Sequence, residues 1–169
     1  NLTQYEQIEL HKNLVLDYHH SANTDSAIQE LHVLLKYDKS NEWAIAQLST
    51  LYRELRNWTK SGEYLTKYHQ LANIEDKHKL SLYKVQEGRK LILQKKFVQS
   101  RQIFEASLNI HNDLAVAYYF IGNSYSSESE VEYQKSLDSN LELKADSNAN
   151  KDPLDNAKIL LGKAIPMWI

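Results

Sequence analysis

Leu48-Ser49-Thr50-Leu51-Tyr52 is the stretch that decides the fold, because variants of it return along the chain. Each variant has a small or modest residue second and a large residue fifth. We call the fifth residues the anchors; they are Tyr18, Tyr52, Leu91 and Tyr125. The first two anchors are 34 residues apart, and so are the last two. The middle step is longer by five, with the extra residues most easily placed in 73–79. A recurring period of this length indicates a repeat architecture.

The residues that follow the anchors repeat as well. Nine positions after each of the first three anchors the residue is small, namely Ala27, Ser61 and Ser100. Four positions further it is large, namely Leu31, Leu65 and Phe104. Apolar residues occur at helical spacing almost throughout, without sustained alternation. The pattern predicts two antiparallel helices per unit, with small residues where helices cross and large residues between units.

This pattern resembles the tetratricopeptide repeat, whose signature places an aromatic residue, Leu-Gly, Tyr, Ala, Phe or Tyr, and Ala at these offsets. Gly88 and Gly122 keep the family's glycine. The resemblance implies an all-α, right-handed superhelical solenoid of about four helix-turn-helix repeats. It also implies one domain over residues 1–169, with repeats at about 8–41, 42–75, 81–114 and 115–169.

The fourth unit departs from the rule. After Tyr125 the next matching small residue is Ala157, followed by Leu161 and Ala164. The intervening segment 135–153 is rich in Ser, Asp, Asn, Lys and Ala, and we expect a flexible insertion there, with Pro153 starting the next helix. The apolar tail after Pro166, residues 167–169, is interpreted as a truncation point where further repeats pack. A capping contact or a homo-oligomer contact is the alternative.

Composition and charge exclude several classes of protein. The 169 residues are 42% hydrophobic and 25% charged, which is typical of a folded chain, and there is no cysteine for disulfides, thiolate metal sites or catalysis. The net charge is −2 and no basic cluster occurs, which disfavours nucleic-acid binding. No window is apolar enough for a membrane span. Because the chain begins with Asn1, we expect an excised or processed product, cytoplasmic or associated with the cell envelope, with any anchor in a segment outside this chain.

No constellation of residues indicates catalysis. None of the seven histidines lies three or four positions from another, so no pair shares a helix face at metal-ligand spacing. Residues 146–150 imitate the start of a calcium loop, but Lys151 stands where glycine is needed and Ala157 where a bidentate Glu is needed. The serines and carboxylates are not accompanied by the residues that would activate a nucleophile or form an acid–base pair. We therefore predict no enzyme, no catalytic residue, no metal site and no cofactor.

The resemblance places ligand binding on a concave groove lined by the first helix of each repeat. The groove offsets fall on Glu9, Lys12, Leu16, His19, Trp43, Ala46, Thr50, Arg53, Leu82, Val85, Arg89, Ile92, Val116, Tyr119, Asn123 and Ser126. Six of these form our candidate partner-binding set, which includes residue types that dominate interface energetics: Lys12, Trp43, Arg53, Arg89, Tyr119 and Asn123. The mixed surface suits a peptide or partner helix. The alternative is that Leu82, Val85, Ile92 and Val116 simply pack one helix against its neighbours.

Related repeat families suggest two narrower functional interpretations. Chaperone-binding members of the repeat family carry a carboxylate clamp, in which Lys12 fits but Leu16 and Thr50 replace asparagines, so an acidic chaperone tail is disfavoured. The segment 2–7 and the long third first-helix from Asp76 are similar to the bacterial lipopolysaccharide assembly protein B family. That family consists of membrane-anchored regulators of lipopolysaccharide synthesis with a four-cysteine zinc domain, and this chain contains no cysteine.

The sequence thus predicts a non-catalytic protein–protein interaction module, an adaptor or scaffold whose partner is another protein or a peptide. Two alternatives remain open. One is a cell-envelope or membrane-associated repeat protein that stabilises a dedicated partner or regulates lipopolysaccharide assembly. The other is a self-associating structural repeat protein.

Overall fold

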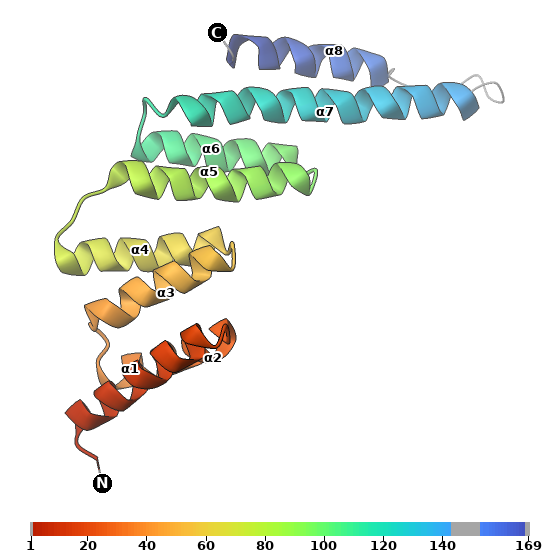
Figure 1. Cartoon of the computed structure of the whole chain (residues 1–169). Helices are drawn as coiled ribbons and strands as arrows, with labels where there is room; N and C mark the ends of the chain where they lie inside the picture. The colour runs from red at the N-terminus through yellow and green to blue at the C-terminus, as the bar shows by residue number, and fades with distance from the viewer. Residues whose placement is uncertain (1, 143–152, 168–169) are drawn as a thin grey trace. The chain divides into compact units, whose positions relative to one another are not determined.

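The computed structural model describes residues 2–142 and 153–167, and the regular secondary structure of these residues is entirely helical. The chain divides into two compact units, residues 1–83 and 84–169, which are described separately. The helices, labelled in Figure 1, are α1 (Gln4–His20), α2 (Thr24–Tyr37), α3 (Glu42–Glu54), α4 (Trp58–Ala72), α5 (Lys77–Leu93), α6 (Phe97–Ile110), α7 (Ala115–Glu142), α8 (Pro153–Ala164) and the short 3-10 helix η1 (Ile165–Met167).

In the first unit, successive helices pack as antiparallel hairpins. Helix α1 packs on α2, α2 on α3, and α3 on α4 (Figure 1). The predicted crossing residues Ala27 and Ser61 are fully buried. The large residue Leu31, fully buried as well, joins Leu48 and Leu51 in one apolar core. Small residues at the crossings and large residues between hairpins therefore occupy the places that the repeat pattern predicts.

Three hairpin turns share one backbone conformation. Ala22, Arg56 and Lys95 have left-handed φ angles of 57°, 53° and 59°. Each of the three stands four positions after an anchor, so the turns keep the spacing of the anchors. In each turn the next residue donates its backbone N–H to the anchor carbonyl: Asn23 to Tyr18 at 2.8 Å, Asn57 to Tyr52 at 2.8 Å and Lys96 to Leu91 at 2.9 Å. The predicted all-α class, with helix-turn-helix repeats in this register, is confirmed.

In two of these turns, the residue after the left-handed position also caps the N-terminus of the second helix. The Asn23 side chain accepts the N–H of Ser26, and the Asn57 side chain accepts the N–H of Lys60, both at 3.3 Å. These contacts satisfy backbone donors that a helix end otherwise leaves unpaired. Lys96, the equivalent residue in the third turn, makes no such side-chain bond.

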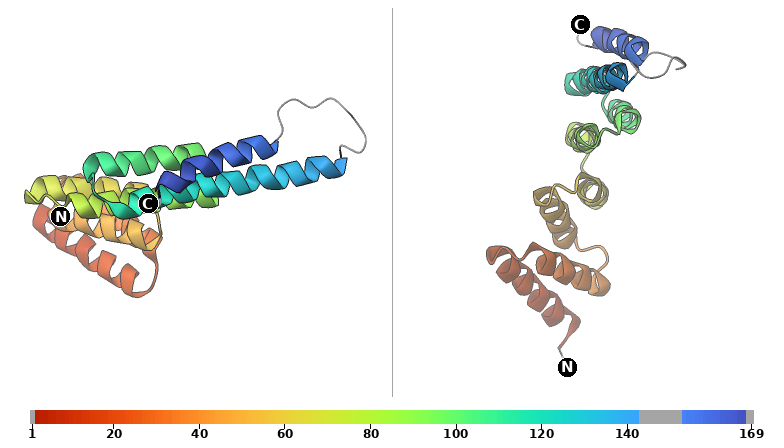
Figure 2. Two further views of the ribbon diagram at one scale, coloured as in Figure 1. Left: turned by 90° about the horizontal axis from the view of Figure 1, so that it is seen from above. Right: turned by 90° about the vertical axis from the view of Figure 1, so that its right-hand side faces the viewer.

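In the second unit, α6 packs on α7 and α7 packs on α8; the views in Figure 2 show α8 running alongside α7. Gly88 of α5 faces Phe104 of α6, and a Cβ atom built on Gly88 would lie 2.5 Å from Phe104 Cε1. Because real Cβ atoms do not approach ring carbons so closely, only glycine allows this contact. The family glycine that the sequence retains at Gly88 thus lets two helices approach.

The expected insertion at 135–153 is partly wrong. Helix α7 extends to Glu142, so residues 135–142 are helical, whereas residues 143–152 lie outside the described residues. Ser129, which stands four positions after the anchor Tyr125 and is thus the counterpart of Lys95, remains inside the helix. Its hydroxyl donates to the Ala157 carbonyl of α8 at 2.6 Å. Residues 129–142 contain no glycine or proline, and within them Lys135 pairs with Glu132 at 2.6 Å, at a spacing that supports a helix.

Helix α8 begins at Pro153, as predicted. Ala157 and Ala164 are buried, in agreement with their expected places at a helix crossing. Leu161 is 44% exposed, although its counterpart Leu31 is fully buried, so the expected packing role of Leu161 is wrong for the described chain. Leu31 is covered by α3, which follows its hairpin, whereas no described helix follows α8 and η1. Trp168 and Ile169 of the apolar tail lie outside the described residues.

Candidate partner-binding surface

In the first unit, α1 and α3 bring Lys12 and Trp43 together. The Lys12 ammonium lies 5.9 Å from the centre of the Trp43 ring and 2.8 Å from Glu9 Oε1. Trp43 is half-buried and packs against the apolar core. A cation over an exposed aromatic face contributes about 0.5–1 kcal/mol. The sequence predicted these two residues on one surface, and their contact makes a half-buried aromatic platform with the Lys12–Glu9 ion pair at its rim.

The same two helices make a second contact near their C-terminal ends. His19 Nε2 lies 3.2 Å from Glu54 Oε2, and both side chains are exposed. Arg53, the neighbour of Glu54, is exposed as well, and Leu16 leaves 44% of its surface open between the two contacts along α1. Three of the candidate residues, Lys12, Trp43 and Arg53, therefore belong to α1 and α3 of one unit, with an apolar side chain beside them.

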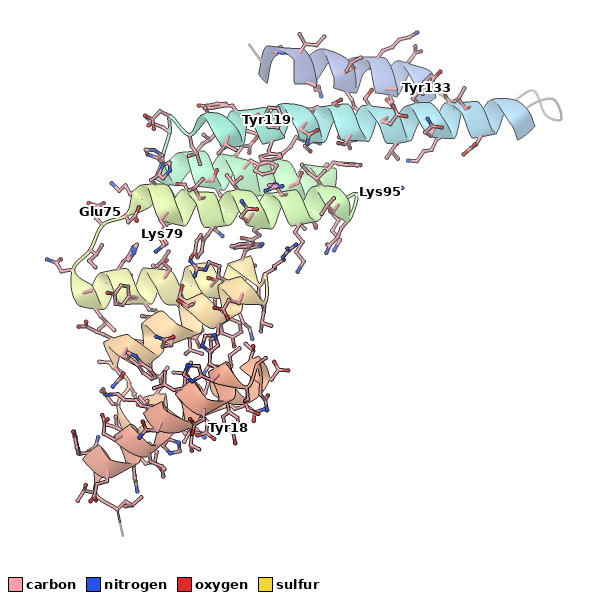
Figure 3. The ribbon with its side chains drawn as sticks, in the orientation of Figure 1. Tyr18, Glu75, Lys79, Lys95, Tyr119 and Tyr133 are labelled. Atoms are coloured by element: carbon pink, nitrogen blue, oxygen red, sulfur yellow. The ribbon has the colours of Figure 1, made fainter. Side chains whose placement is uncertain are left out.

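In the second unit, Arg89 and Tyr119 are organised around a third residue. The Arg89 guanidinium carbon lies 5.0 Å from the centre of the Phe120 ring, and its Nη1 donates to Gln86 Oε1 at 2.9 Å. The Tyr119 ring meets the same Phe120 edge-on at 5.2 Å. Tyr119 is 55% exposed and labelled in Figure 3. Phe120 in turn stacks on Phe104 at 5.7 Å, which anchors the cluster in the core.

The remaining groove positions are buried or half-buried. Val85 is buried, so the simple packing role is confirmed for it. Leu82, Ile92 and Val116 are half-buried, as is the candidate Asn123. Among the described residues, no hydrogen bond, ion pair or ring contact joins Asn123 to Arg89 or Tyr119. The second unit thus offers an Arg–Tyr pair held by Phe120, with Asn123 further along the same helix.

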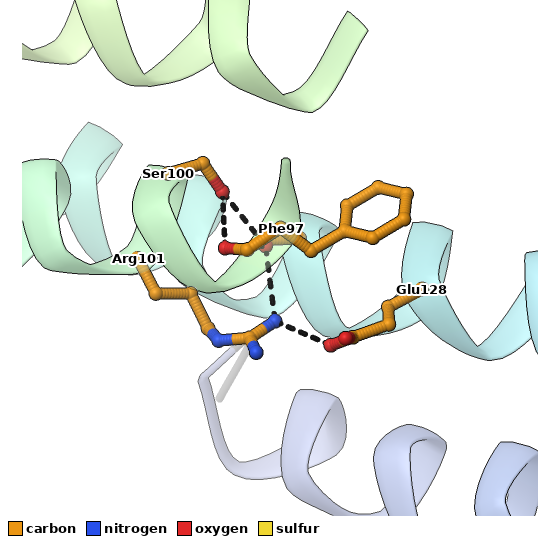
Figure 4. A network of polar contacts seen from close by, with 5 residues as sticks. Phe97, Ser100, Arg101 and Glu128 are labelled. Carbon is orange, nitrogen blue, oxygen red and sulfur yellow. Dashed lines mark hydrogen bonds and ion pairs between the residues drawn. The ribbon is translucent and has the colours of Figure 1, made fainter. Parts of the chain in front are cut away.

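A buried polar network fixes the helices behind this pair (Figure 4). Arg101 of α6 contacts Glu128 of α7 at 2.7 Å and the Ser124 hydroxyl at 3.2 Å. The Ser100 and Ser124 hydroxyls lie 3.0 Å apart, and both donate to the Phe97 carbonyl, at 2.7 and 3.2 Å. Because its polar groups have partners, this network holds α7 firmly, and Tyr119 is carried on that helix.

Neither metal ligation nor membrane insertion is indicated by the described residues. No group of three or more His, Asp or Glu side chains is arranged to hold a metal ion among them. In the same residues, no helix combines the length and apolar character that a membrane span requires. The described residues do include aromatic rings beside cations and exposed apolar side chains.

Two features of the structure were not predicted from the sequence. Phe120 was not singled out, although it positions both Arg89 and Tyr119. A cluster of His32, Tyr52 and Tyr64 was also not foreseen. The three residues come from three helices, and only the tertiary arrangement brings them together.

Comparisons with known proteins give structural similarities without a family assignment. No protein-family model and no curated protein matches the sequence. Among solved structures, the chain is similar to the MamA protein, with 15% identity over 96% of this chain and 88% of the other and a TM-score of 0.42. MamA from Desulfovibrio magneticus RS-1 is 16% identical over 95% of this chain and 94% of its own, with a TM-score of 0.40.

A third similarity involves a variant of the O-GlcNAc transferase of Thermobaculum terrenum. Its identity is 14%, its TM-score is 0.41, and the match covers 75% of this chain. The chain spans only 23% of the transferase's length. The resemblance to the tetratricopeptide repeat is carried by the chain's own repeating turns and helix crossings. The narrower resemblance to the lipopolysaccharide assembly protein B family stays a prediction.

Proposed function

We propose that this protein is a non-catalytic interaction module, an adaptor or scaffold that binds a peptide or helix of a partner protein on its first-helix surface. The observation that carries the proposal is the cluster of Arg89 and Tyr119 around Phe120. Arginine and tyrosine are enriched among residues that dominate binding energy. A Tyr ring held edge-on by a core-anchored Phe loses little freedom on binding, so its exposed face is preorganised.

The first unit supports the same proposal with a second platform. Trp43 is half-buried against the core while Lys12 lies over its ring, and Leu16 and Arg53 are exposed nearby on the same helices. A half-buried aromatic side chain with adjacent apolar and cationic groups suits an amphipathic segment, which buries its apolar face and keeps its charges at the rim.

The test compares two double variants of the full chain. Cross-linking and affinity capture from the native source identify partners of the wild type, and binding to a purified partner is then measured. Arg89→Ala with Tyr119→Ala should weaken binding by about tenfold or more, because two anchor residues are lost. Lys95→Ala with Tyr133→Ala removes one cation and one exposed tyrosine elsewhere in the same unit, and it serves as the matched control (Figure 3).

Both double variants should retain the helical circular dichroism of the wild type, since all four side chains are exposed. If the Arg89/Tyr119 variant binds as tightly as the control, the first-helix surface of the second unit is not the site. The same experiment then applies to Lys12 and Trp43 in the first unit.

A further inference from the structure

The first unit carries a compact aromatic cluster built from α2, α3 and α4, and none of its residues belongs to the candidate partner-binding set. Tyr52 and Tyr64 stack with ring centres 5.7 Å apart and planes inclined by 12°. His32 of α2 completes the cluster, with its Nε2 3.4 Å from the Tyr52 hydroxyl and its ring 6.1 Å from that of Tyr64. Tyr52 is buried, whereas His32 and Tyr64 are half-buried. The cluster is therefore a firm base whose outer part remains open.

Two ammonium groups lie over this base. Lys60 Nζ is 5.0 Å from the centre of the Tyr52 ring, and Lys67 Nζ is 4.9 Å from that of Tyr64. Lys60, Tyr64 and Lys67 follow each other at helical spacing on one face of α4, so the aromatic ring lies between the two lysines. Both lysines are exposed.

These two lysines lack the carboxylate partner that several other lysines have. Lys12, Lys77, Lys84, Lys135 and Lys158 each form an ion pair with a carboxylate. Within the described part of the chain, neither Lys60 nor Lys67 forms such a pair, although Glu63 lies between them in the sequence. Two exposed positive charges without an ion-pair partner, held beside a partly buried aromatic base, attract an anion.

His32 responds to the same charges. Burial lowers the pKa of His32, and the positive charges of Lys60 and Lys67 lower it further. The lysine charges thus reach the His32 ring, and an anion placed between the lysines would oppose their effect. This coupling makes the His32 ring a local reporter of whatever binds there.

We propose that His32, Tyr52, Lys60, Tyr64 and Lys67 form a second binding surface, independent of the first-helix surface, that receives a carboxylate-rich segment of a partner protein. Carboxylates accept charge-assisted hydrogen bonds from the two ammonium groups, while the aliphatic parts of the glutamate or aspartate side chains pack on the tyrosine rings. The patch presents two cations in a protein of net charge −2, whereas a nucleic-acid backbone needs a longer basic stripe. An acidic peptide therefore fits the charge and size of the patch.

The test titrates the full ¹⁵N-labelled protein with a hexaglutamate peptide and, separately, with a six-nucleotide oligothymidylate, at low ionic strength. Hexaglutamate should shift the resonances of His32, Tyr64, Lys60 and Lys67 in a saturable manner and should raise the pKa of the His32 ring. Lys60→Gln with Lys67→Gln should weaken peptide binding by about tenfold, because both charge-assisted contacts are lost. Lys39→Gln with Lys79→Gln makes the same change of net charge at exposed lysines of the same unit. This control should change the affinity for hexaglutamate less than about twofold.

Both double variants replace exposed side chains, so both should remain folded by circular dichroism. The proposal is overturned if the two double variants bind hexaglutamate equally, if the shifted resonances map elsewhere, or if the peptide does not saturate the protein. It is also overturned if oligothymidylate binds the patch more tightly than hexaglutamate. None of these results bears on Arg89 and Tyr119, so this surface and the first-helix surface are tested separately.

Discussion

Gly88 and Phe104 pack so closely that a single added carbon would collide with the ring: a Cβ atom on Gly88 would lie 2.5 Å from Cε1 and 2.8 Å from Cδ1 and Cζ. Phe104 has no exposed surface, and its ring also stacks on Phe120. The ring therefore has no free space into which it can retreat. This contact joins the helix packing of the second unit to the cluster that holds Arg89 and Tyr119.

Gly88→Ala should consequently destabilise the protein. Forcing a carbon into a packed contact costs about 1–3 kcal/mol, more than the helical preference of alanine over glycine returns. Gly162→Ala is the control, because nothing lies within 4 Å of a Cβ atom there, and it should stabilise α8 by about 0.5–1 kcal/mol. Urea denaturation of the two variants measures both effects, and equal stabilities would contradict the packing argument.

The left-handed turns are strained wherever glycine is absent. Ala22 has a φ of 57°, a conformation that costs an L-residue about 1–2 kcal/mol and glycine almost nothing. Ala22→Gly should therefore raise the free energy of unfolding by up to about 1 kcal/mol, after allowance for the more flexible unfolded chain. Ala46→Gly, inside α3, should have the opposite sign. Thermal unfolding followed by far-ultraviolet circular dichroism, which reports helix content, distinguishes the two.

His69 carries an unpaired nitrogen in the interior. Its Nδ1 is buried without a hydrogen-bond partner among the described residues, and only 7% of the residue is exposed. Leu35 and Leu108 stand at the same offset from the anchors of two other units. His69→Leu should therefore stabilise the protein by about 1 kcal/mol, because it removes an unsatisfied polar atom. His20→Leu, at an exposed site, should change stability by less than about 0.5 kcal/mol; a loss of stability in His69→Leu would show that the imidazole has a role beyond packing.

The Arg101–Glu128 pair should be worth more than a surface ion pair. The two side chains are 11% and 21% exposed, and the Arg101 guanidinium carbon also lies 4.1 Å from the centre of the Tyr125 ring. Arg101→Met leaves Glu128 without its cation and should cost about 2–3 kcal/mol. Glu128→Gln keeps an acceptor for Arg101 and should cost only about 1 kcal/mol. A cost for Arg101→Met no larger than for the glutamine variant would mean that the pair is effectively solvated.

The stability of the first unit should depend on the protonation of His32. The folded state holds the pKa of His32 below its ordinary value of 6.5, first through burial and then through Lys60 and Lys67. The unfolded chain therefore binds the proton more readily, so the contribution of neutral His32 is complete above about pH 6.5 and is lost as the pH falls. His32→Gln should reduce the decline in melting temperature on acidification, whereas Lys67→Gln should raise the pKa of the His32 ring in an NMR titration. An unchanged acid profile in His32→Gln would assign the decline to other groups.

The helix-turn-helix architecture could be predicted because it depends on the spacing of the anchors along the sequence. The three left-handed turns at Ala22, Arg56 and Lys95 have the same unequal sequence separations as the anchors Tyr18, Tyr52 and Leu91. Turn position depends on a few consecutive residues, and the sequence order preserves it. The insertion was harder to predict, because the composition of residues 135–142 is compatible with both a loop and an exposed helix.

The candidate surface was predictable only in part. The helical offsets placed Lys12, Trp43, Arg53, Arg89, Tyr119 and Asn123 on first helices, and whether a partner binds them stays a prediction. The residues that organise the surface were not predictable in this way. Phe120 of α7 adjoins Tyr119 in the sequence, but it packs with Arg89 of α5. His32 of α2 likewise contacts Tyr52 of α3 and Tyr64 of α4.

By itself, the sequence determined most of the helices and their pairing into hairpins, because these depend on periodic burial and on short local turns. Only the tertiary structure decided that α7 runs past the expected turn, that Phe120 supports Arg89 and Tyr119, and that two lysines without carboxylate partners lie over stacked tyrosines. The physical reason is that these features depend on distances between side chains of different helices. Such distances follow from how the helices pack, which a repeat period alone does not specify.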